Sequence, residues 1–299
     1  MLYAGLEMGG TKTIAVLGVP GDIRERLEFP TTTPEETLGQ AARILDRWQR
    51  EGALAGLGIA SFGPVRLDPF AADYGTILNT PKPGWHGTRV VAALAEAFPG
   101  PIALDTDVSA GAVAEHRLGA ARGCATMVYL TIGTGVGGGI LVNGKPLHGA
   151  LHPEVGHMRL HRDREDPFPG SCAYHGDCVE GLVSGTALTA RFGCSPADIA
   201  ASDPRWQLVA GDLAELLANL LLVISPQRIV VGGGVIMKQP HLLPAAIAAL
   251  PERLGGYLGN VDARSLAVRI VKPQLGNDAG PQGSLCLAEA AAHSSVTDR

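Results

Sequence analysis

Two stretches of this chain share one pattern of apolar residues. Apolar side chains alternate over residues 2–6 and again over 14–18, on either side of Gly9–Gly10. Residues 126–142 repeat this arrangement around the glycine-rich turn that begins at Gly133. A period of two is typical of a strand with one buried face, and glycine between two such runs favours a tight turn. Each stretch therefore predicts a strand, a turn and a second strand.

A helical period appears between these hairpins and after them. Residues 34–50 begin with Pro34 and two glutamates, and their apolar residues then fall on one face. Further helices are predicted at 88–98, 110–118, 184–191, 212–224, 242–254 and 284–293, and further strands at 57–62, 101–104, 228–231 and 266–271. Because strands and helices alternate along the chain, the predicted class is α/β.

Length and composition narrow the possible partners and compartment. With 299 residues, 46% of them hydrophobic, the chain can form two domains with packed cores. A net charge of −5 and a pI of about 6.0 argue against a nucleic-acid partner. The N-terminus lacks a secretory signal pattern, and no run of 18 apolar residues predicts a membrane span. The odd number of cysteines, five, suits a reducing cytoplasm.

The glycine turns are candidate phosphate sites. Gly9 and Gly10 let a backbone approach a ligand, and the Thr11–Thr13 run after them, with Lys12 at its centre, adds polar groups. A turn without a ligand is the alternative. The pair Gly133–Thr134 repeats Gly10–Thr11 at a distance of 123 residues. This repeat suggests one hairpin in each of two duplicated domains, and it favours phosphate binding by both turns.

A third group of glycines follows a predicted strand. Gly232, Gly233 and Gly234 come directly after residues 228–231 and precede the next helix. A strand that runs into glycines before a helix suits close approach of a nucleotide, although three glycines alone are a weak signal.

Residues 152–180 hold the densest group of metal-binding side chains. His157, Cys172, His175 and Cys178 lie within 22 residues, and the last three are spaced by three. A tight turn can therefore direct these three toward one centre, and His157 can complete a tetrahedron. Two thiolates and two imidazoles suit a structural zinc ion. The alternative is a polar surface loop that happens to be rich in histidine and cysteine.

Two aspartates follow the predicted strand 101–104. Asp105 and Asp107 flank Thr106, and a helix is expected to start shortly after them. Acidic groups at the carboxyl end of a strand in an α/β sheet are well placed for chemistry. An aspartate that caps the helix is an equally good explanation from this segment alone.

Together these residues resemble the ROK family of sugar kinases and repressors, and most closely its bacterial fructokinase branch. The resemblance covers nearly the whole chain. It includes the two glycine turns, Thr106–Asp107, the run Glu154–Val155–Gly156–His157 and the run Cys172–Glu180. The chain departs from the common family pattern at Glu7, where Asp is usual, and at Thr106 and Ser109, where Asn is usual. Cys172 followed by His175–Gly176, together with Thr106–Asp107, is similar to the fructokinase branch.

The resemblance implies a two-domain actin/hexokinase-like, or ribonuclease H-like, fold with an active-site cleft between the domains. The small domain would comprise residues 1–118 and about 285–299, and the large domain 119–284. The implied reaction is transfer of the γ-phosphoryl group of ATP, with Mg²⁺, to fructose, forming fructose 6-phosphate. Homodimers are common in the family, so a homodimer is expected.

The resemblance also implies roles for individual residues. Asp107 would be the general base, and Asn79, Thr106, Glu154, His157 and Glu180 would bind the sugar. His157 would use one ring nitrogen for Zn²⁺ and the other for the sugar. The residues expected to contact ATP are Gly9, Gly10, Thr11, Lys12, Thr13, Gly133, Thr134, Gly135, Gly232, Gly233 and Gly234.

Two alternatives share much of this pattern. A kinase for glucose, mannose or an N-acylated hexosamine would carry every motif named above. A sugar-responsive repressor of the same family would need a DNA-binding segment before the first strand, which here begins at Leu2. The short N-terminus and the negative net charge therefore make a repressor the weaker expectation.

Overall fold

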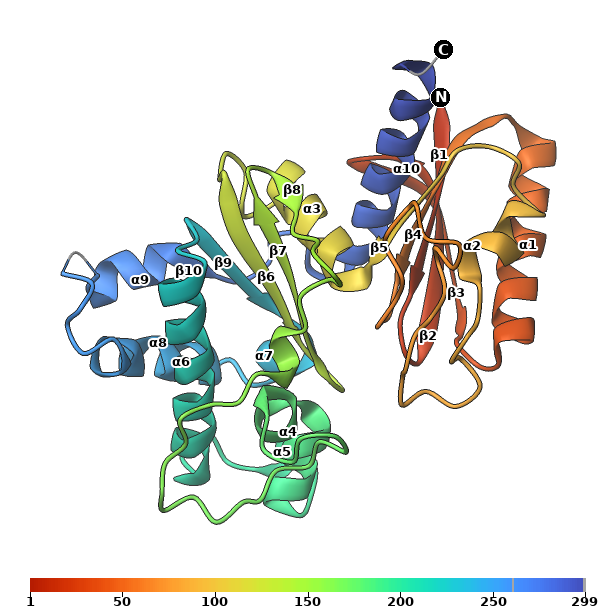
Figure 1. Cartoon of the computed structure of the whole chain (residues 1–299). Helices are drawn as coiled ribbons and strands as arrows, with labels where there is room; N and C mark the ends of the chain where they lie inside the picture. Colours follow the sequence, from red (N-terminus) through yellow and green to blue (C-terminus); the bar gives the residue numbers. More distant parts are fainter. Residues whose placement is uncertain (260, 298–299) are drawn as a thin grey trace. The chain divides into compact units, whose positions relative to one another are not determined.

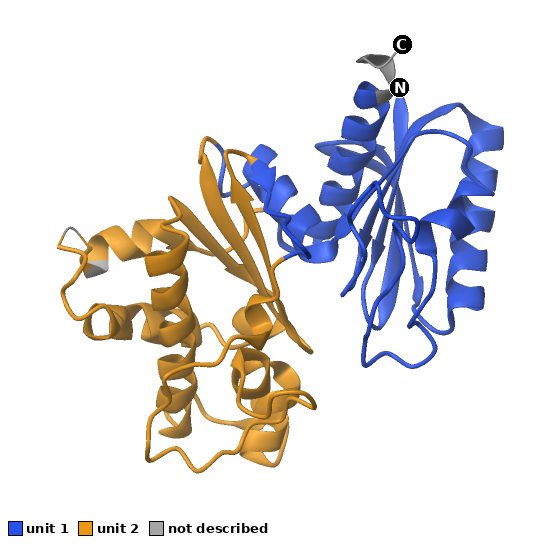
Figure 2. Ribbon diagram, viewed as in Figure 1, with its two compact units in different colours: residues 1–122, 145–152, 275–299 blue, residues 123–144, 153–274 orange. Residues whose placement is uncertain are grey.

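The computed structural model describes residues 1–259 and 261–297, which form two compact units (Figure 1, Figure 2). Unit 1 contains residues 1–122, 145–152 and the C-terminal stretch from Leu275, and unit 2 contains residues 123–144 and 153–274. The expected division placed residues 119–122, 145–152 and 275–284 in the larger domain, whereas all three stretches group with unit 1 here. This grouping depends on contacts between residues that are far apart in sequence. The local sequence pattern does not predict such contacts.

Unit 1 is built on a five-stranded sheet in the order β3-β2-β1-β4-β5. Strands β1 (Leu2–Met8), β2 (Lys12–Val19) and β3 (Asp22–Pro30) form an antiparallel meander, while β4 (Leu54–Ser61) and β5 (Ile102–Thr106) continue from β1 in parallel. Its helices are α1 (Pro34–Glu51), α2 (Val90–Ala95), α3 (Asp107–Arg117) and α10 (Ala279–Thr297), with a 3₁₀ turn at Gly276–Asp278. The parallel strands β4 and β5 therefore end at the same edge as β1, where the candidate residues of this unit gather.

Helix α10 packs directly on the sheet of unit 1. It contacts β1, β4 and α3, and Gly58 of β4 lies so close to the backbone carbonyl of Ser284 that a Cβ would not fit there. On the other face, α1 buries Leu38, Leu45 and Trp48. The hydroxyl of Thr33 caps α1 by accepting a hydrogen bond from the Glu36 amide at 3.3 Å, as expected for a helix that starts at proline.

The second five-stranded sheet has the order β10-β9-β6-β7-β8, and its strands lie in unit 2 except for β8, whose residues group with unit 1. Strands β6 (Thr126–Ile132) and β7 (Val136–Val142) form the second hairpin, β8 (Lys145–Pro146) is the edge beside β7, and β9 (Arg228–Gly232) runs parallel to β6 and β10 (Ile270–Val271). The helices are α4 (Val179–Val183), α5 (Gly185–Phe192), α6 (Arg205–Val223), α7 (Gly234–Lys238), α8 (Leu242–Arg253) and α9 (Ala263–Arg269), with 3₁₀ turns at Val155–His157 and Pro196–Asp198.

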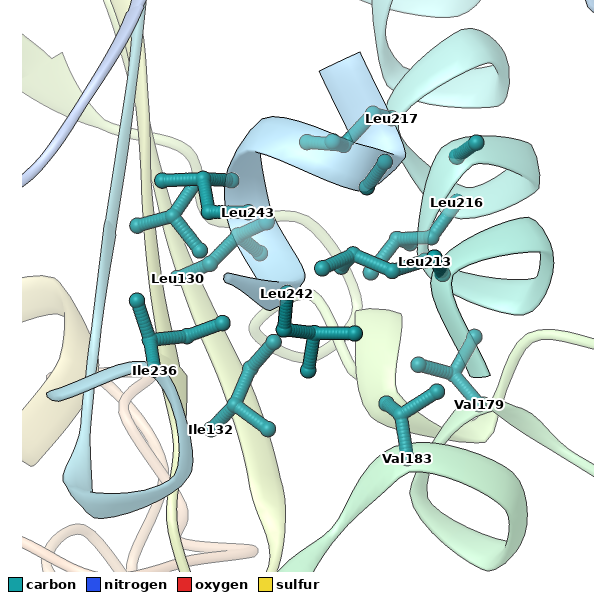
Figure 3. Packing of buried hydrophobic residues seen from close by; sticks show 14 of the residues in the cluster. Leu130, Ile132, Val179, Val183, Leu213, Leu216, Leu217, Ile236, Leu242 and Leu243 are labelled. Atoms are coloured by element: carbon teal, nitrogen blue, oxygen red, sulfur yellow. The ribbon is translucent and has the colours of Figure 1, made fainter. Parts of the chain in front are cut away.

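The core of unit 2 forms where α6 and α8 meet strand β6. Figure 3 shows leucines of α6 and α8 facing Leu130 and Ile132 of β6, with Val179 and Val183 of α4 beside them. Within the described residues, α6 is the single helix whose length and composition would let it cross a membrane, and 61% of its most apolar stretch is buried in this core. Burial of that kind is what a core helix of an α/β unit requires.

The element predictions from the sequence differ from the structure in several places. Strand β3 was not predicted, and α6 and α10 begin at Arg205 and Ala279, earlier than expected. Residues 266–271 were expected to form a strand, but most of them belong to α9, and only Ile270–Val271 pair with β9. A capping box between Asp262 and Ser265 starts that helix. The helix expected at 88–98 is shorter, since α2 covers Val90–Ala95, and the helix expected at 110–118 begins earlier, at Asp107. The α/β class itself is confirmed.

Candidate active site

Asp107 is the first residue of α3, directly after β5 ends at Thr106. Its side chain is partly exposed, and Oδ1 accepts a hydrogen bond from the Val108 amide at 2.9 Å. Burial raises the pKa of Asp107 to about 6, because loss of water disfavours the ionised carboxylate. Such a carboxylate is still largely ionised at neutral pH and is more basic than an ordinary aspartate, which suits a general base.

The two residues before Asp107 have other contacts. Asp105 is buried, pairs with His148 Nε2 at 3.1 Å and accepts a hydrogen bond from the Thr106 amide at 2.7 Å. The Thr106 hydroxyl is the N-cap of α3 and accepts from the Ser109 amide at 3.1 Å. Asp105 thus belongs to strand β5, whereas Asp107 already belongs to helix α3. The observed contacts favour a capping role for Thr106, which had been expected to bind sugar.

Glu7 is a functional candidate to which the sequence pattern gave no role. It lies on β1, where burial, followed by the negative charge of Asp107, raises its pKa to about 7. Helix α10 packs so closely on its carboxylate that Gly280 has no space for a side chain. The sequence did contain a signal for Glu7, because it is a single acidic residue in an otherwise apolar strand that leads into a glycine turn. Two neighbouring carboxylates with raised pKa values are common in active sites.

The first glycine turn joins β1 to β2. Gly9 donates its amide hydrogen to the Lys12 carbonyl at 2.9 Å, and this contact closes the turn. Gly10 and Thr11 are exposed at its tip, so their backbone amides are accessible to a ligand. The turn is therefore free of bulky side chains where a phosphate oxygen would approach.

The two residues after the tip are engaged within unit 1. Lys12 forms an ion pair with Glu28 at 3.1 Å. Thr13 is fully buried, and its hydroxyl lies 2.9 Å from that of Thr31. These contacts favour a supporting role for Thr13, although both residues had been expected to contact phosphate.

Asn79, expected to bind sugar, lies in the long irregular segment between β4 and α2. Its side chain is exposed. The segment is held at its neighbour Leu78, whose amide donates to the Pro64 carbonyl at 2.7 Å. An exposed amide on an anchored segment is well suited to contact a polar ligand.

The second glycine turn, Gly133–Gly135, joins β6 to β7 in unit 2 and is fixed by the helices beside it. The amide of Gly185, at the start of α5, donates to the Gly133 carbonyl at 2.7 Å. Glu180 of α4 accepts a hydrogen bond from the Val136 amide through Oε2 at 3.0 Å. A Cβ at Gly135 would lie 2.5 Å from that oxygen, so a larger residue there would displace the Glu180 carboxylate. Glu180, expected to bind sugar, thus also shapes a turn expected to bind phosphate.

Gly232–Gly234 end β9 and begin α7. Gly233 has a φ of +89°, and its Cα packs against the backbone of Ile132, where a side chain would clash. The glycines therefore already have a structural reason to be present, namely the close packing of this turn on β6. They also leave the turn bare, as a nucleotide site requires.

The four candidate metal ligands lie together in unit 2. The ligand atoms of His157, Cys172, His175 and Cys178 are all within 4.8 Å of one another. The Sγ–Nδ1 distances are 3.8 Å from Cys172 to each histidine and 3.7 Å from Cys178 to His157. In a tetrahedral zinc site with bonds of about 2.0–2.3 Å, ligand atoms lie about 3.3–3.8 Å apart. The cluster therefore fits a tetrahedral metal ion.

The ring of His157 has a defined orientation in this cluster. Its Nδ1 faces both thiols, which leaves Nε2 on the opposite edge of the ring. Glu154, just before it, is exposed, and its carbonyl accepts from the His157 amide at 3.0 Å. The main chain is tied across the cluster, because the Val179 amide donates to the Met158 carbonyl at 2.9 Å. His157 can thus bind a metal through one nitrogen and a second ligand through the other.

Comparisons with known proteins identify the family. A model of the ROK family matches residues 3–291. The chain belongs to the ROK family.

This ROK chain is 43% identical over 300 residues to the fructokinase of Zymomonas mobilis, with 97% of both proteins covered. It is 37% identical over 293 residues to the fructokinase of Pediococcus pentosaceus, covering 97% of this chain and 99% of the relative. Among solved structures, the ROK hexokinase of Thermus thermophilus superposes with a TM-score of 0.77 at 27% identity, and both chains are covered completely. The predicted family and the two-domain sugar-kinase fold are both confirmed.

Proposed function

We propose that this ROK-family chain is an ATP-dependent fructokinase that phosphorylates D-fructose to fructose 6-phosphate. The observation that carries the proposal is the 43% identity to a fructokinase across 97% of both chains. The raised pKa of Asp107 supports it, because the reaction needs a base beside the attacking hydroxyl.

In the proposed mechanism, Asp107 accepts the proton of the sugar hydroxyl that attacks the γ-phosphorus of ATP. The exposed tips of the two glycine turns bind the phosphates through backbone amides, and Gly232–Gly234 leave room for the adenosine. Mg²⁺ bound to ATP would neutralise part of the phosphate charge. Little covalent chemistry is then required of the protein beyond positioning and proton acceptance.

Sugar binding is assigned to four side chains, namely Asn79, Glu154, Glu180 and His157 through Nε2. Glu180 has its Oε2 on the Val136 amide, so Oε1 is the oxygen available to a hydroxyl group. Thr106 supports this arrangement as the helix cap before Asp107.

We further propose that the cluster of two histidines and two cysteines binds one Zn²⁺ per chain. Burial raises the pKa of the Cys178 thiol to about 11, so a thiolate at this position needs a cation beside it. Bound zinc would fix the loop that carries His157 and thereby orient the histidine for the sugar. A homodimer in the cytoplasm, where ATP is available, completes the proposal.

A coupled assay of ADP release with a panel of sugars tests the activity. We expect fructose to have the highest kcat/KM, with weaker activity on mannose because a few hydroxyl contacts discriminate between hexoses. A higher kcat/KM for glucose or an N-acylated hexosamine would refute the fructose assignment and leave the kinase assignment intact. Light scattering during gel filtration tests the dimer.

A further inference from the structure

The segment that carries Asn79 is fastened to the rest of unit 1 by Trp85. The Trp85 side chain is fully buried, and its ring meets that of Phe62 edge to face at 5.0 Å. Its Nε1 donates a hydrogen bond to the Thr32 carbonyl at 2.8 Å. Residues 78–85, called here the acceptor segment, are therefore held against the end of β3 and the start of α1.

Lys82 links this acceptor segment to the first glycine turn. Its Nζ donates to the Gly10 carbonyl at 2.6 Å and to the Thr31 carbonyl at 3.0 Å. The Thr31 amide in turn donates to the Thr11 carbonyl at 3.0 Å. Lys82 thus joins three pieces of chain, namely the acceptor segment, the tip of the glycine turn and the residue after β3.

The other cations near this turn differ from Lys82 in their partners. Lys12 pairs with Glu28, and Arg26 pairs with Glu28 and Asp278. The contacts of Lys82 in the described part of the chain are both backbone carbonyls, so no carboxylate neutralises its charge. The ammonium has three hydrogens, and two of them are used in these contacts.

We propose that Lys82 is a positioning residue that couples the acceptor segment to the phosphate turn. The inference rests on the proposed kinase function and adds a residue to its machinery. In-line transfer requires the attacking hydroxyl and the γ-phosphorus to meet in one narrow geometry, and a displacement of about 1 Å can cost on the order of 10²-fold in rate. A side chain that bridges the segment for the sugar and the turn for the phosphate sets that geometry within unit 1.

Two substitutions separate the contacts from the bulk of the side chain. Lys82→Met keeps the aliphatic stem but removes the charge and both hydrogen bonds. Lys82→Arg keeps the charge and can donate to two carbonyls. Lys272→Met is the matched control, because Lys272 is an exposed lysine outside the candidate site.

For Lys82→Met we expect kcat to fall by roughly 10²-fold. The Kd for ATP should change by less than about threefold, because Lys82 is not expected to bind phosphate itself. The fraction of ATP that is hydrolysed without forming sugar phosphate should increase, because the sugar hydroxyl is no longer held in line with the γ-phosphorus. Lys82→Arg should recover much of kcat, and Lys272→Met should match the unmodified protein. A large loss of ATP affinity with unchanged kcat would overturn the positioning role and indicate direct phosphate binding.

Hydrogen–deuterium exchange of the ligand-free protein provides a second readout that needs no activity. Lys82→Met should speed amide exchange by up to about tenfold in peptides that cover residues 8–13 and 78–85, which is the scale of one lost hydrogen bond. Unchanged exchange would overturn the inference. If exchange changes as expected and the unmodified protein phosphorylates no sugar, the proposed function fails while the structural coupling stands.

Discussion

Replacing Asp107 by Asn should weaken catalysis and stabilise the fold at the same time. Asparagine has nearly the same shape, and its Oδ1 can still accept the hydrogen bond from the Val108 amide, which is 2.9 Å long in the native protein. What the substitution removes is the negative charge and the base. Loss of a general base typically lowers the rate by about 10²–10⁴-fold, so kcat should fall by that factor while zinc content and ATP binding persist.

The gain in stability follows from the pKa of the native side chain. Burial raises the pKa of Asp107 from 3.8 to about 6, so the folded chain holds this proton more tightly than the unfolded chain. Between these two values the free energy of unfolding falls as pH rises, and above about pH 6 the full penalty of the buried charge remains. A pKa difference of one between the folded and unfolded states corresponds to about 1.4 kcal/mol in the free energy of unfolding. After allowance for the partial exposure of the group, the penalty is about 1–2 kcal/mol.

Two measurements check this reasoning. Thermal unfolding at pH 7 should show a midpoint for Asp107→Asn that is higher by a few degrees, and this difference should shrink toward pH 4. The kcat/KM of the unmodified enzyme should rise with pH through about 6, where Asp107 ionises.

Asp105→Asn is the matched control. It weakens the partly buried contact of Asp105 with His148, so it should destabilise the fold and reduce kcat less than Asp107→Asn. The assignment of Asp107 as a general base with a raised pKa would be refuted if Asp107→Asn retained more than about a tenth of kcat, since base removal usually costs more. A lower unfolding midpoint would refute it as well.

The remaining predictions concern unit 2. Purified protein should contain one zinc per chain, and Cys178→Ser should lose both the metal and sugar binding. Metal analysis that finds less than half an equivalent of zinc, together with full activity in chelator, would contradict the zinc site. Glu180→Gln should raise the KM for fructose and leave the KM for ATP nearly unchanged, since an amide oxygen can still accept from the Val136 amide. Glu180→Ala should raise both KM values, because the turn at Gly135 also loses its support; equal KM values for ATP in the two variants would argue against that support.

The fold was largely predictable because its information is local. Alternating apolar residues marked β1, β2, β6 and β7, and an apolar stripe beginning at Pro34 marked α1. Prediction failed where a local pattern was ambiguous. Residues 266–271 have the composition of a strand, but the capping box at Asp262 starts a helix, and only two residues pair with β9. The grouping of 145–152 with unit 1 depends on His148–Asp105 and on His152, which accepts from the Val65 amide at 3.2 Å.

The four candidate metal ligands could be recognised from the sequence as one group, whereas the contacts of the other candidate residues could not. Spacing alone brought the four metal ligands to notice, because three of them share one short turn. Spacing cannot reveal which of two lysines is neutralised. Lys12 follows the glycine turn directly and was the obvious phosphate ligand, yet it faces Glu28. Lys82 is 72 residues from Gly10 in sequence, and its ammonium donates a hydrogen bond to the Gly10 carbonyl in the same turn. A residue's task here depends on the partner that the fold brings to it, and for charged side chains that partner decides whether the charge is available to a substrate.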